Sequence, residues 1–311
     1  FAPHSLSLPR HQFLDRAKRY NDFFRDIKPF KHEKKARHKK LRIGYISPDL
    51  RLHVVSFFSI VLFECYDRSS FEVYCYMNHD EDHVSAQIKS MVDHWLNIKD
   101  LPRKDVARRI YKDEIDILFD LSGHTADSVL PIMAYKPAPI QISGIGYFDT
   151  TGLSTIDYFL ADKFLDPDGS NQQFFTEKLL LMDHSHFCFT WHENSVDYQP
   201  PAPCIRNGFV TFGSFNSFAK ITSQVLDAWK KILDQVPNSQ LYLKISGGQS
   251  VIEIVKKKIQ DSGISMNRVR IEGHESNYIE RYGEMDIALD SFPYPGGGTS
   301  CDALYMGVPL I

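Results

Sequence analysis

A run of three glycines marks the stretch of the sequence with the clearest chemical meaning. Residues 294–302 read Tyr-Pro-Gly-Gly-Gly-Thr-Ser-Cys-Asp and lie between a predicted strand and a predicted helix. Glycine lets a ligand approach the backbone closely, and the N–H groups at a helix start attract anions. We therefore interpret Gly296, Gly297, Gly298 and Thr299 as a pyrophosphate-binding loop. The alternative is a flexible turn closed by a capping box between Thr299 and Asp302.

Asp302 and Lys220 bear on the same chemistry. A carboxylate in the first turn of a helix repels phosphate, so a functional Asp302 should contact sugar hydroxyls instead. Lys220 follows the predicted strand 209–213 and precedes a helix capped by Thr222 or Ser223. A lysine there can bind a diphosphate as a point charge, although an exposed surface lysine fits the spacing equally well. The glycine spacing matches neither a P-loop nor a dinucleotide-binding fingerprint.

Two histidines occupy equivalent places after predicted strands. His53 follows the strand 41–47, and His124 follows the strand 116–121. Either side chain could act as a base or orient a hydroxyl, while helix capping or packing is the alternative for His53. Four carboxylates at strand ends could also serve as a base, and the sequence does not rank them: Asp49, Asp120, Asp149 and Asp290.

A metal site is not expected. His184 and His186 share a strand face, but no carboxylate or cysteine partner completes a ligand set in the sequence. The five cysteines are odd in number, contain no CxxC pair, and indicate buried free thiols. Residues 246–250, Ser-Gly-Gly-Gln-Ser, read better as an ordinary strand-to-helix turn than as a second phosphate loop.

Strands and helices alternate in two series, which predicts α/β architecture with parallel sheets. A proline-rich linker at 191–208 separates the series. We expect a helical lead-in and basic linker at 1–40, a first α/β lobe at 41–200 and a second α/β lobe at 201–311. The lead-in contains one amphipathic helix at 11–30.

The expected strands are 41–47, 71–77, 116–121, 140–143, 157–160, 178–181, 209–213, 240–245, 269–272 and 287–290. The further expected helices are 54–65, 84–94, 104–112, 129–135, 222–236, 251–262, 277–282 and 300–306.

The composition narrows the class of protein. The 311 residues are 43% apolar and 24% charged with a net charge of -3, which argues against nucleic acid as the main partner. No apolar run approaches the ~20 residues that span a bilayer, and residues 1–10 do not resemble a signal peptide. We therefore expect a cytoplasmic protein without a membrane partner. The apolar residues 307–311 predict that further sequence follows.

Several ordered motifs carry a family resemblance. They are residues 41–49, 122–125, 136–141, Gly146-Tyr147 with Thr151-Gly152, 208–216 with Lys220, and 290–302. Over residues 41–311 the chain resembles the O-GlcNAc transferase and SPINDLY family of glycosyltransferases. The segment 208–221 is more similar to SPINDLY and its bacterial relatives than to the animal enzymes.

The resemblance implies a GT-B fold, two Rossmann-like lobes facing a cleft, with the second lobe incomplete at its C-terminal end. It implies that the lobe at 41–200 binds the acceptor and that the lobe at 201–311 binds the nucleotide sugar. It implies inverting, metal-free transfer of a sugar to Ser/Thr hydroxyls of proteins. The favoured sugar is N-acetylglucosamine, with UDP-N-acetylglucosamine as its donor, and no cofactor is implied. N-terminal tetratricopeptide repeats of the family hold protein substrates, and the helix at 11–30 is the expected remnant. The implied donor-site residues are Asn216, Ser217, Lys220, Tyr278, Arg281, Gly296, Gly297, Gly298, Thr299, Asp302, Gly146 and Tyr147. The implied catalytic residue is His53, with His124 and Lys220 as further candidates.

Other readings stay open. Gly297, Gly298 and Thr299 stand where the animal enzyme has a histidine and threonines, so GDP-fucose is an alternative donor. A nucleotide-sugar epimerase or a sugar phosphorylase would keep the fold, but no pyridoxal phosphate lysine can be assigned. A non-catalytic module that binds nucleotide sugars or proteins is the third alternative.

Overall fold

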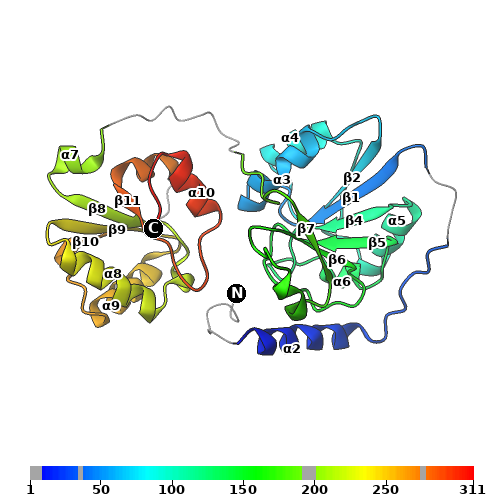
Figure 1. The fold of residues 1–311 in the computed structure, drawn as a ribbon. Coiled ribbons are helices and arrows are strands. Elements are labelled where there is room, and N and C mark those ends of the chain that lie inside the picture. The colour runs from blue at the N-terminus through cyan, green and yellow to red at the C-terminus, as the bar shows by residue number, and fades with distance from the viewer. Residues whose placement is uncertain (1–8, 34–37, 191–200, 274–277) are drawn as a thin grey trace. The chain divides into compact units, whose positions relative to one another are not determined.

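The computed structural model describes residues 9–33, 38–190, 201–273 and 278–311. The chain folds into two compact units, one from Leu8 to His192 and one formed mainly by the residues that follow (Figure 1). Each unit contains one parallel sheet. Among the described residues, no helix is both long and apolar enough to cross a membrane.

The first unit is built on seven parallel strands in the order β3-β2-β1-β4-β5-β6-β7. The chain starts in the middle of the sheet and winds outward in both directions, which is the doubly wound arrangement. In such sheets, ligands bind outside the carboxyl ends of the strands. The strands are β1 (Leu41–Ser47), β2 (Phe71–Met77), β3 (His94–Asn97), β4 (Ile117–Asp120), β5 (Ile140–Ser143), β6 (Tyr158–Asp162) and β7 (Lys178–Met182).

Helices cover both faces of this sheet because side chains along each strand point alternately to the two sides. On β1, Tyr45 contacts Phe63 of α3 (Val54–Glu64), with ring centroids 5.2 Å apart. Its neighbour Ile46 joins the core on the opposite face, together with Val106 of α5 (Arg103–Lys112). The helix α4 (His83–Met91) packs beside α3, and the short α6 (Leu130–Met133) contributes to the core around α5.

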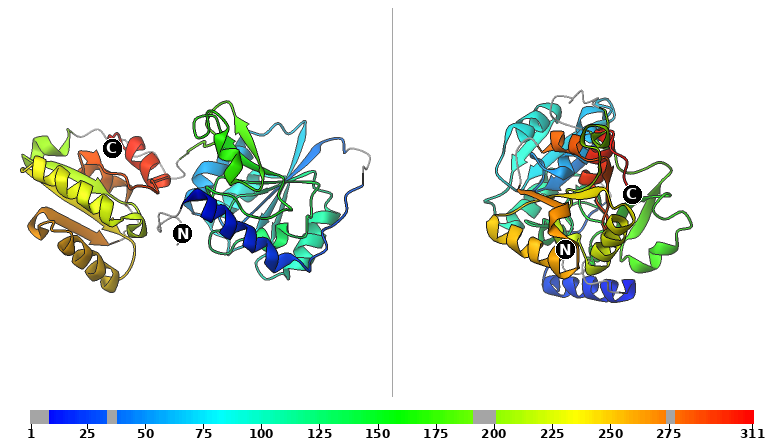
Figure 2. Two further views of the ribbon diagram at one scale, coloured as in Figure 1. Left: turned by 60° about the horizontal axis from the view of Figure 1, so that its bottom comes forward. Right: turned by 90° about the vertical axis from the view of Figure 1, so that its left-hand side faces the viewer.

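The N-terminal helix is shorter than the prediction of 11–30. The helix α2 covers Arg10–Tyr20, and a 3-10 turn, η1 (Asn21–Phe24), follows it. The turn brings the ring of Phe24 to 5.0 Å from that of Tyr20, and Phe30 stacks on Tyr111 at 4.7 Å. The helical prediction failed after Tyr20 because these aromatic residues pack onto the first unit instead of continuing one helical face. The helix runs along one side of that unit, as both Figure 1 and the left view of Figure 2 show.

The predicted basic linker at 31–40 is partly anchored. The carbonyl of Lys31 accepts the Tyr111 hydroxyl at 3.0 Å, and the His32 ring lies 2.8 Å from the carbonyl of Lys136. Residues 34–37 lie outside the described part of the chain, as do residues 191–200 of the predicted linker.

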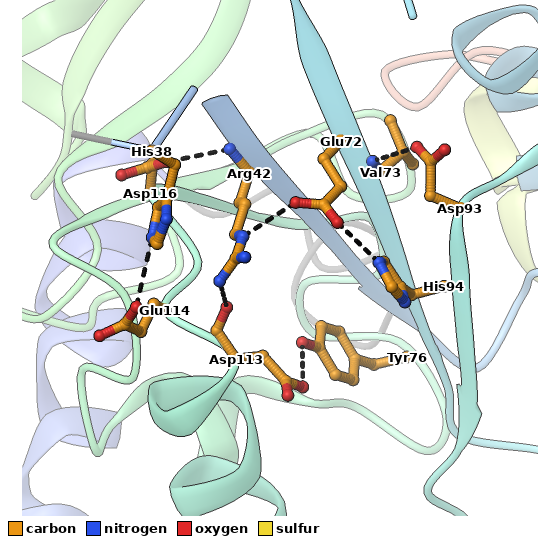
Figure 3. A network of polar contacts seen from close by, with 10 residues as sticks. All are labelled: His38, Arg42, Glu72, Val73, Tyr76, Asp93, His94, Asp113, Glu114 and Asp116. Atoms are coloured by element: carbon orange, nitrogen blue, oxygen red, sulfur yellow. Dashed lines mark hydrogen bonds and ion pairs between the residues drawn. The ribbon is translucent and has the colours of Figure 1, made fainter. Parts of the chain in front are cut away.

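A polar network ties the amino ends of four strands together (Figure 3). The guanidinium of Arg42 donates to Glu72 at 2.9 Å, and Glu72 also contacts His94 at 2.8 Å. The backbone N–H of Arg42 donates to Asp116 at 2.8 Å. These residues begin or precede β1, β2, β3 and β4, so the network lies at the edge opposite the carboxyl ends.

The second unit repeats the same winding on a smaller scale, with strand order β10-β9-β8-β11. Leu241 and Leu243 of β9 face a core formed with Trp229 of α8 and Ile259 of α9. The strands are β8 (Val210–Ser214), β9 (Ser239–Ile245), β10 (Val269–Gly273) and β11 (Ile287–Ala288). The helices are α7 (Pro203–Asn207), η3 (Phe218–Lys220), α8 (Ser223–Gln235), α9 (Gln249–Asp261), η4 (Met266–Arg268), η5 (Ile279–Glu284) and α10 (Gly298–Tyr305).

Some local predictions were wrong. The strand β3 occupies the end of the predicted helix 84–94, and α7 lies within the predicted linker 191–208. The predicted helix 277–282 is a 3-10 turn that starts at Ile279, and its first residue lies outside the described residues. All five cysteines are free, but Cys65 and Cys188 are exposed, so the expectation of buried thiols holds fully only for Cys75.

Candidate active site

His53 lies at the carboxyl edge of the first sheet, where the chain leaves β1 and enters α3. Its Nδ1 accepts the backbone N–H of Val55 at 3.3 Å, so the imidazole caps the helix. The same Nδ1 lies 3.5 Å from Oδ1 of Asp49. The capping interpretation is therefore confirmed, and the capping bond keeps the ring proton on Nε2. In this state Nε2 can donate a hydrogen bond to a group outside the helix, and it cannot accept one.

Burial shifts the pKa values of His53 and Asp49 in opposite directions. It lowers the pKa of His53 to about 4, with a further contribution from the positive charge of Arg51. It raises the pKa of Asp49 to about 6, against the opposing effect of Arg51. At neutral pH, His53 is therefore uncharged and Asp49 is ionised.

Asp120 organises the next loop along the same edge. Its carboxylate is fully buried and accepts the N–H and hydroxyl of Ser122 at 2.9 and 2.8 Å, and the Ser143 hydroxyl at 2.7 Å. It also accepts the N–H of Gly123 at 3.0 Å. Burial raises the pKa of Asp120, and these hydrogen bonds act against the shift. The bonds fix the turn that carries His124, which makes Asp120 a loop-holding residue in this structure.

His124 is held by three neighbours. Its Nε2 lies 2.7 Å from the carbonyl of Thr151, and its ring meets those of Tyr20 and Tyr147 edge-on, at 4.6 and 5.4 Å between centroids. Thr151 is fixed in turn by Glu177, whose buried carboxylate accepts the Thr151 N–H at 2.8 Å and also its hydroxyl. Tyr20 belongs to α2, so the N-terminal helix contacts a candidate site residue directly.

Gly146 explains how these loops come together. A Cβ at this position would lie 2.1 Å from the carbonyl oxygen of Leu121 and 3.2 Å from the side chain of Val55. The missing side chain therefore lets the loop before Tyr147 pack against both the end of β4 and the start of α3. The structure brings His124, Gly146 and Tyr147 together beside the helix that His53 caps.

In the second unit, the glycine-rich loop joins β11 to α10 and is closed by Asp290. The Oδ1 of this carboxylate accepts the N–H groups of Ser291 and Gly296, both at 2.7 Å. A Cβ on Gly296 would lie 2.3 Å from the Ser300 hydroxyl oxygen, whereas a Cβ on Gly297 would meet nothing within 4 Å. The loop is therefore a tight turn at Gly296 that opens to space at Gly297, and α10 begins at Gly298.

Lys220 reaches this loop from the segment after β8. Its Nζ donates to the Pro295 carbonyl at 3.0 Å and lies 4.4 Å from the ring centroid of Tyr294. Burial lowers the pKa of Lys220, and the charge of Asp290 opposes that shift. The structure thus brings Lys220 and the predicted phosphate loop together.

Asp302 does not form the capping box that was considered for α10. No side chain caps that helix, and Gly297 occupies the cap position. Asp302 is only 3% exposed, and its Oδ2 accepts the Tyr278 hydroxyl at 3.2 Å. Its Oδ1 is buried with no hydrogen-bond partner among the described residues. Burial raises the pKa of Asp302 to about 7, and the bond from Tyr278 acts against this.

Most of the other predicted donor-site residues of the second unit lie around the same loop, whereas Gly146 and Tyr147 belong to the first unit. The amide of Asn216 donates to the Ser291 hydroxyl at 2.9 Å, and its own oxygen accepts the N–H of Ser217. Thr299 accepts the Tyr282 hydroxyl at its carbonyl, 3.1 Å away. Arg281, by contrast, pairs with Glu284 at 2.7 Å, a contact that does not involve the glycine loop.

Sequence reasoning missed the residues that hold the loops. Asp290 was one of four unranked carboxylates, and Glu177 carried no signal because its partners lie far away in the sequence. The closeness of Asp49 to His53 could have been found from their spacing of four residues. His186 also gains a carboxylate partner that the sequence did not indicate, Asp162 at 2.7 Å, and both side chains are buried. No group of three metal-binding side chains occurs in the part of the chain that the structure describes.

Known proteins with a similar sequence or fold identify the family of this chain. The model of glycosyl transferase family 41 matches residues 21–199 and 203–311. A Petunia hybrida protein named "Probable UDP-N-acetylglucosamine--peptide N-acetylglucosaminyltransferase SPINDLY" is 37% identical over 285 residues, which cover 88% of this chain and 30% of the relative. The Arabidopsis thaliana protein of the same name is 38% identical over 285 residues, with 88% and 31% coverage.

A solved O-GlcNAc transferase from Thermobaculum terrenum is similar over 99% of this chain and 60% of its own, at 31% identity and a TM-score of 0.83. The expected GT-B class, with two Rossmann-like α/β units, is therefore confirmed. The chain spans about a third of the length of the curated relatives that it matches. The family match covers nearly all of the described residues, and the chain belongs to glycosyl transferase family 41.

Proposed function

We propose that this chain transfers N-acetylglucosamine from UDP-N-acetylglucosamine to serine or threonine hydroxyls of proteins. The observation that carries the proposal is the 3.0 Å contact between Lys220 and the glycine-rich loop, because it joins a cation to a helix start at one place. The names of the curated relatives support the same donor and a peptide acceptor, and the solved relative is named an O-GlcNAc transferase.

The donor binds at the carboxyl edge of the second sheet in this proposal. The first-turn N–H groups of α10 and the ammonium of Lys220 bind the diphosphate. The unpartnered Oδ1 of Asp302 accepts a hydroxyl of the ribose, which gives this buried oxygen the hydrogen bond that it lacks. Tyr278, bonded to the other oxygen of Asp302, lies beside the nucleoside.

The reaction forms a bond from the acceptor oxygen to the anomeric carbon while the bond from that carbon to the diphosphate breaks, and the proton of the acceptor hydroxyl passes to the departing diphosphate or to water. Negative charge passes to the leaving diphosphate, where Lys220 and the start of α10 stabilise it. Attack on the face of the anomeric carbon opposite the diphosphate inverts that centre, and we propose that the positive charge of these groups makes a metal ion or another cofactor unnecessary. His53, with its proton on Nε2, orients an acceptor group by donating a hydrogen bond.

A thermal-shift panel of UDP, GDP and their sugars tests donor binding first. A ligand that binds only the folded chain raises its melting temperature, and the shift grows with the logarithm of the ligand concentration divided by Kd. We expect UDP-N-acetylglucosamine to give the largest shift, and Lys220→Met to abolish most of it. Lys231→Met removes an exposed lysine of the same unit and should leave the shift unchanged.

Product analysis then separates the reactions. Sugar transfer requires a protein acceptor, whereas an epimerase converts the donor alone. A shift with GDP-sugars but not with UDP-sugars would reassign the donor, and binding without turnover in the presence of a protein acceptor would refute transfer by this chain.

A further inference from the structure

The ammonium of Lys220 lies against an aromatic ring as well as against a carbonyl. Its Nζ is 4.4 Å from the ring centroid of Tyr294, within the range of a cation–π contact, and 3.0 Å from the Pro295 carbonyl. Lys220 and Tyr294 are both partly buried, so the contact is less screened by water than one at the surface. The sequence analysis gave Tyr294 no role.

Hydrogen bonds hold the turn that carries Tyr294. The Ser291 hydroxyl donates to the Tyr294 carbonyl at 2.8 Å, and the Asn216 amide donates to the Ser291 hydroxyl at 2.9 Å. Asp290 closes both ends of this turn through the N–H groups of Ser291 and Gly296. Because Asn216 precedes Lys220 in the same segment, one chain of hydrogen bonds connects the lysine segment to the turn that presents the ring.

We propose that Tyr294 is a positioning residue that holds the ammonium of Lys220 at the mouth of the glycine loop for a nucleoside diphosphate. This inference rests on the proposed function, since it assigns the task of Tyr294 in the same donor site. On binding, a phosphate oxygen replaces the Pro295 carbonyl as acceptor, while the ring face stays against the cation. A carboxylate in place of the ring would neutralise the lysine, whereas the ring attracts the cation and leaves its N–H groups available to phosphate.

The test replaces Tyr294 by phenylalanine and then by phenylalanines with one, two and three fluorine atoms on the ring. Fluorine withdraws electron density from the ring face and weakens a cation–π contact with little change in volume. The affinity of the 311-residue chain for UDP is measured by calorimetry. We expect Tyr294→Phe to bind within about twofold of the unchanged chain, and the trifluorinated ring to bind about tenfold more weakly, with the others between them.

Two matched series serve as controls. In a Lys220→Met background the same rings at position 294 should all give equal affinity. The same series at Tyr305, which is 42% exposed at the far end of α10, should also be flat. Equal UDP affinities across the series in the Lys220 background would overturn the positioning role and leave the proposed function standing. Absence of UDP and GDP binding in the unchanged chain would refute both.

Discussion

His53 caps α3 through its Nδ1, which accepts the Val55 N–H at 3.3 Å, while Asp49 lies 3.5 Å from the same nitrogen. One side chain therefore stabilises a helix and also faces the edge of the sheet where ligands of such folds bind. A substitution can separate these two tasks, because asparagine caps helices well but lacks an imidazole.

We predict that His53→Asn leaves the melting temperature nearly unchanged, whereas His53→Ala costs about 1 kcal/mol of stability through loss of the cap. Both variants should lose sugar transfer by roughly tenfold, because the hydrogen bond that Nε2 donates to the acceptor is lost. Thermal unfolding and turnover with a protein acceptor provide the two readouts. Full turnover by His53→Asn would show that the histidine is only a cap.

Gly296→Ala should damage the donor loop without a change of charge. The new Cβ would lie 2.3 Å from the Ser300 hydroxyl oxygen and 3.1 Å from the Asp290 carboxylate, so these side chains must move from the positions in which they close the turn. Overpacking of this kind costs about 1–3 kcal/mol, and we expect UDP affinity to fall at least tenfold. Gly248→Ala is the matched control, since a Cβ there meets nothing within 4 Å and should leave UDP affinity unaltered. Equal affinity in both variants would argue against a role for the tight turn.

Asp302 should make stability depend on pH. Burial raises its pKa in the folded chain to about 7, above its ordinary value of 3.8, so the folded state holds a proton that the unfolded state has released. The stabilisation is complete below about pH 4 and is lost as the pH rises through about 7, at close to 1.4 kcal/mol per pH unit. Urea unfolding at several pH values measures this slope. Asp302→Asn should flatten it in this window, and an unchanged slope in that variant would assign the dependence to another group.

Glu177 should stabilise the loop around Thr151, whose carbonyl contacts His124. Its carboxylate accepts the Thr150 hydroxyl at 2.6 Å and the Thr151 N–H at 2.8 Å while almost fully buried. Removing it in Glu177→Ala leaves these donors without partners and should cost about 2–3 kcal/mol. Hydrogen exchange should accelerate at the Thr151 amide. Glu64→Ala, at an exposed position of the same unit, is expected to change neither property, and an effect confined to global stability would limit Glu177 to a packing role.

Much of the fold was accessible from the sequence because it depends on local patterns. The doubly wound strands follow from alternating apolar runs, and every predicted strand has a counterpart in the structure. The short strand β3 was missed because its four residues follow a helix with no turn signal between them. The end of α2 was missed because Phe24 and Phe30 are placed by tertiary contacts with Tyr20 and Tyr111, which periodicity does not encode.

The candidate site also contains some residues that could be predicted from the sequence and others that could not. Lys220 and the glycine loop could be predicted because each follows a strand whose carboxyl end must reach one edge of the same sheet. The residues that hold the loops could not be predicted. Asp290 closes a turn through backbone N–H groups, and Glu177 bonds a loop residue 26 positions away in the sequence. The assignment of individual site residues to donor or acceptor stays a prediction until binding is measured.

Gly152 carries a constraint that should be visible in evolution. Its φ of +75° already favours glycine, and a Cβ there would lie 2.0 Å from the carbonyl oxygen of Ala17 in α2. Because the clash involves backbone and not a side chain, no substitution at position 17 can relieve it. Among homologous sequences, any residue other than glycine at this position should coincide with a displaced or differently built N-terminal helix.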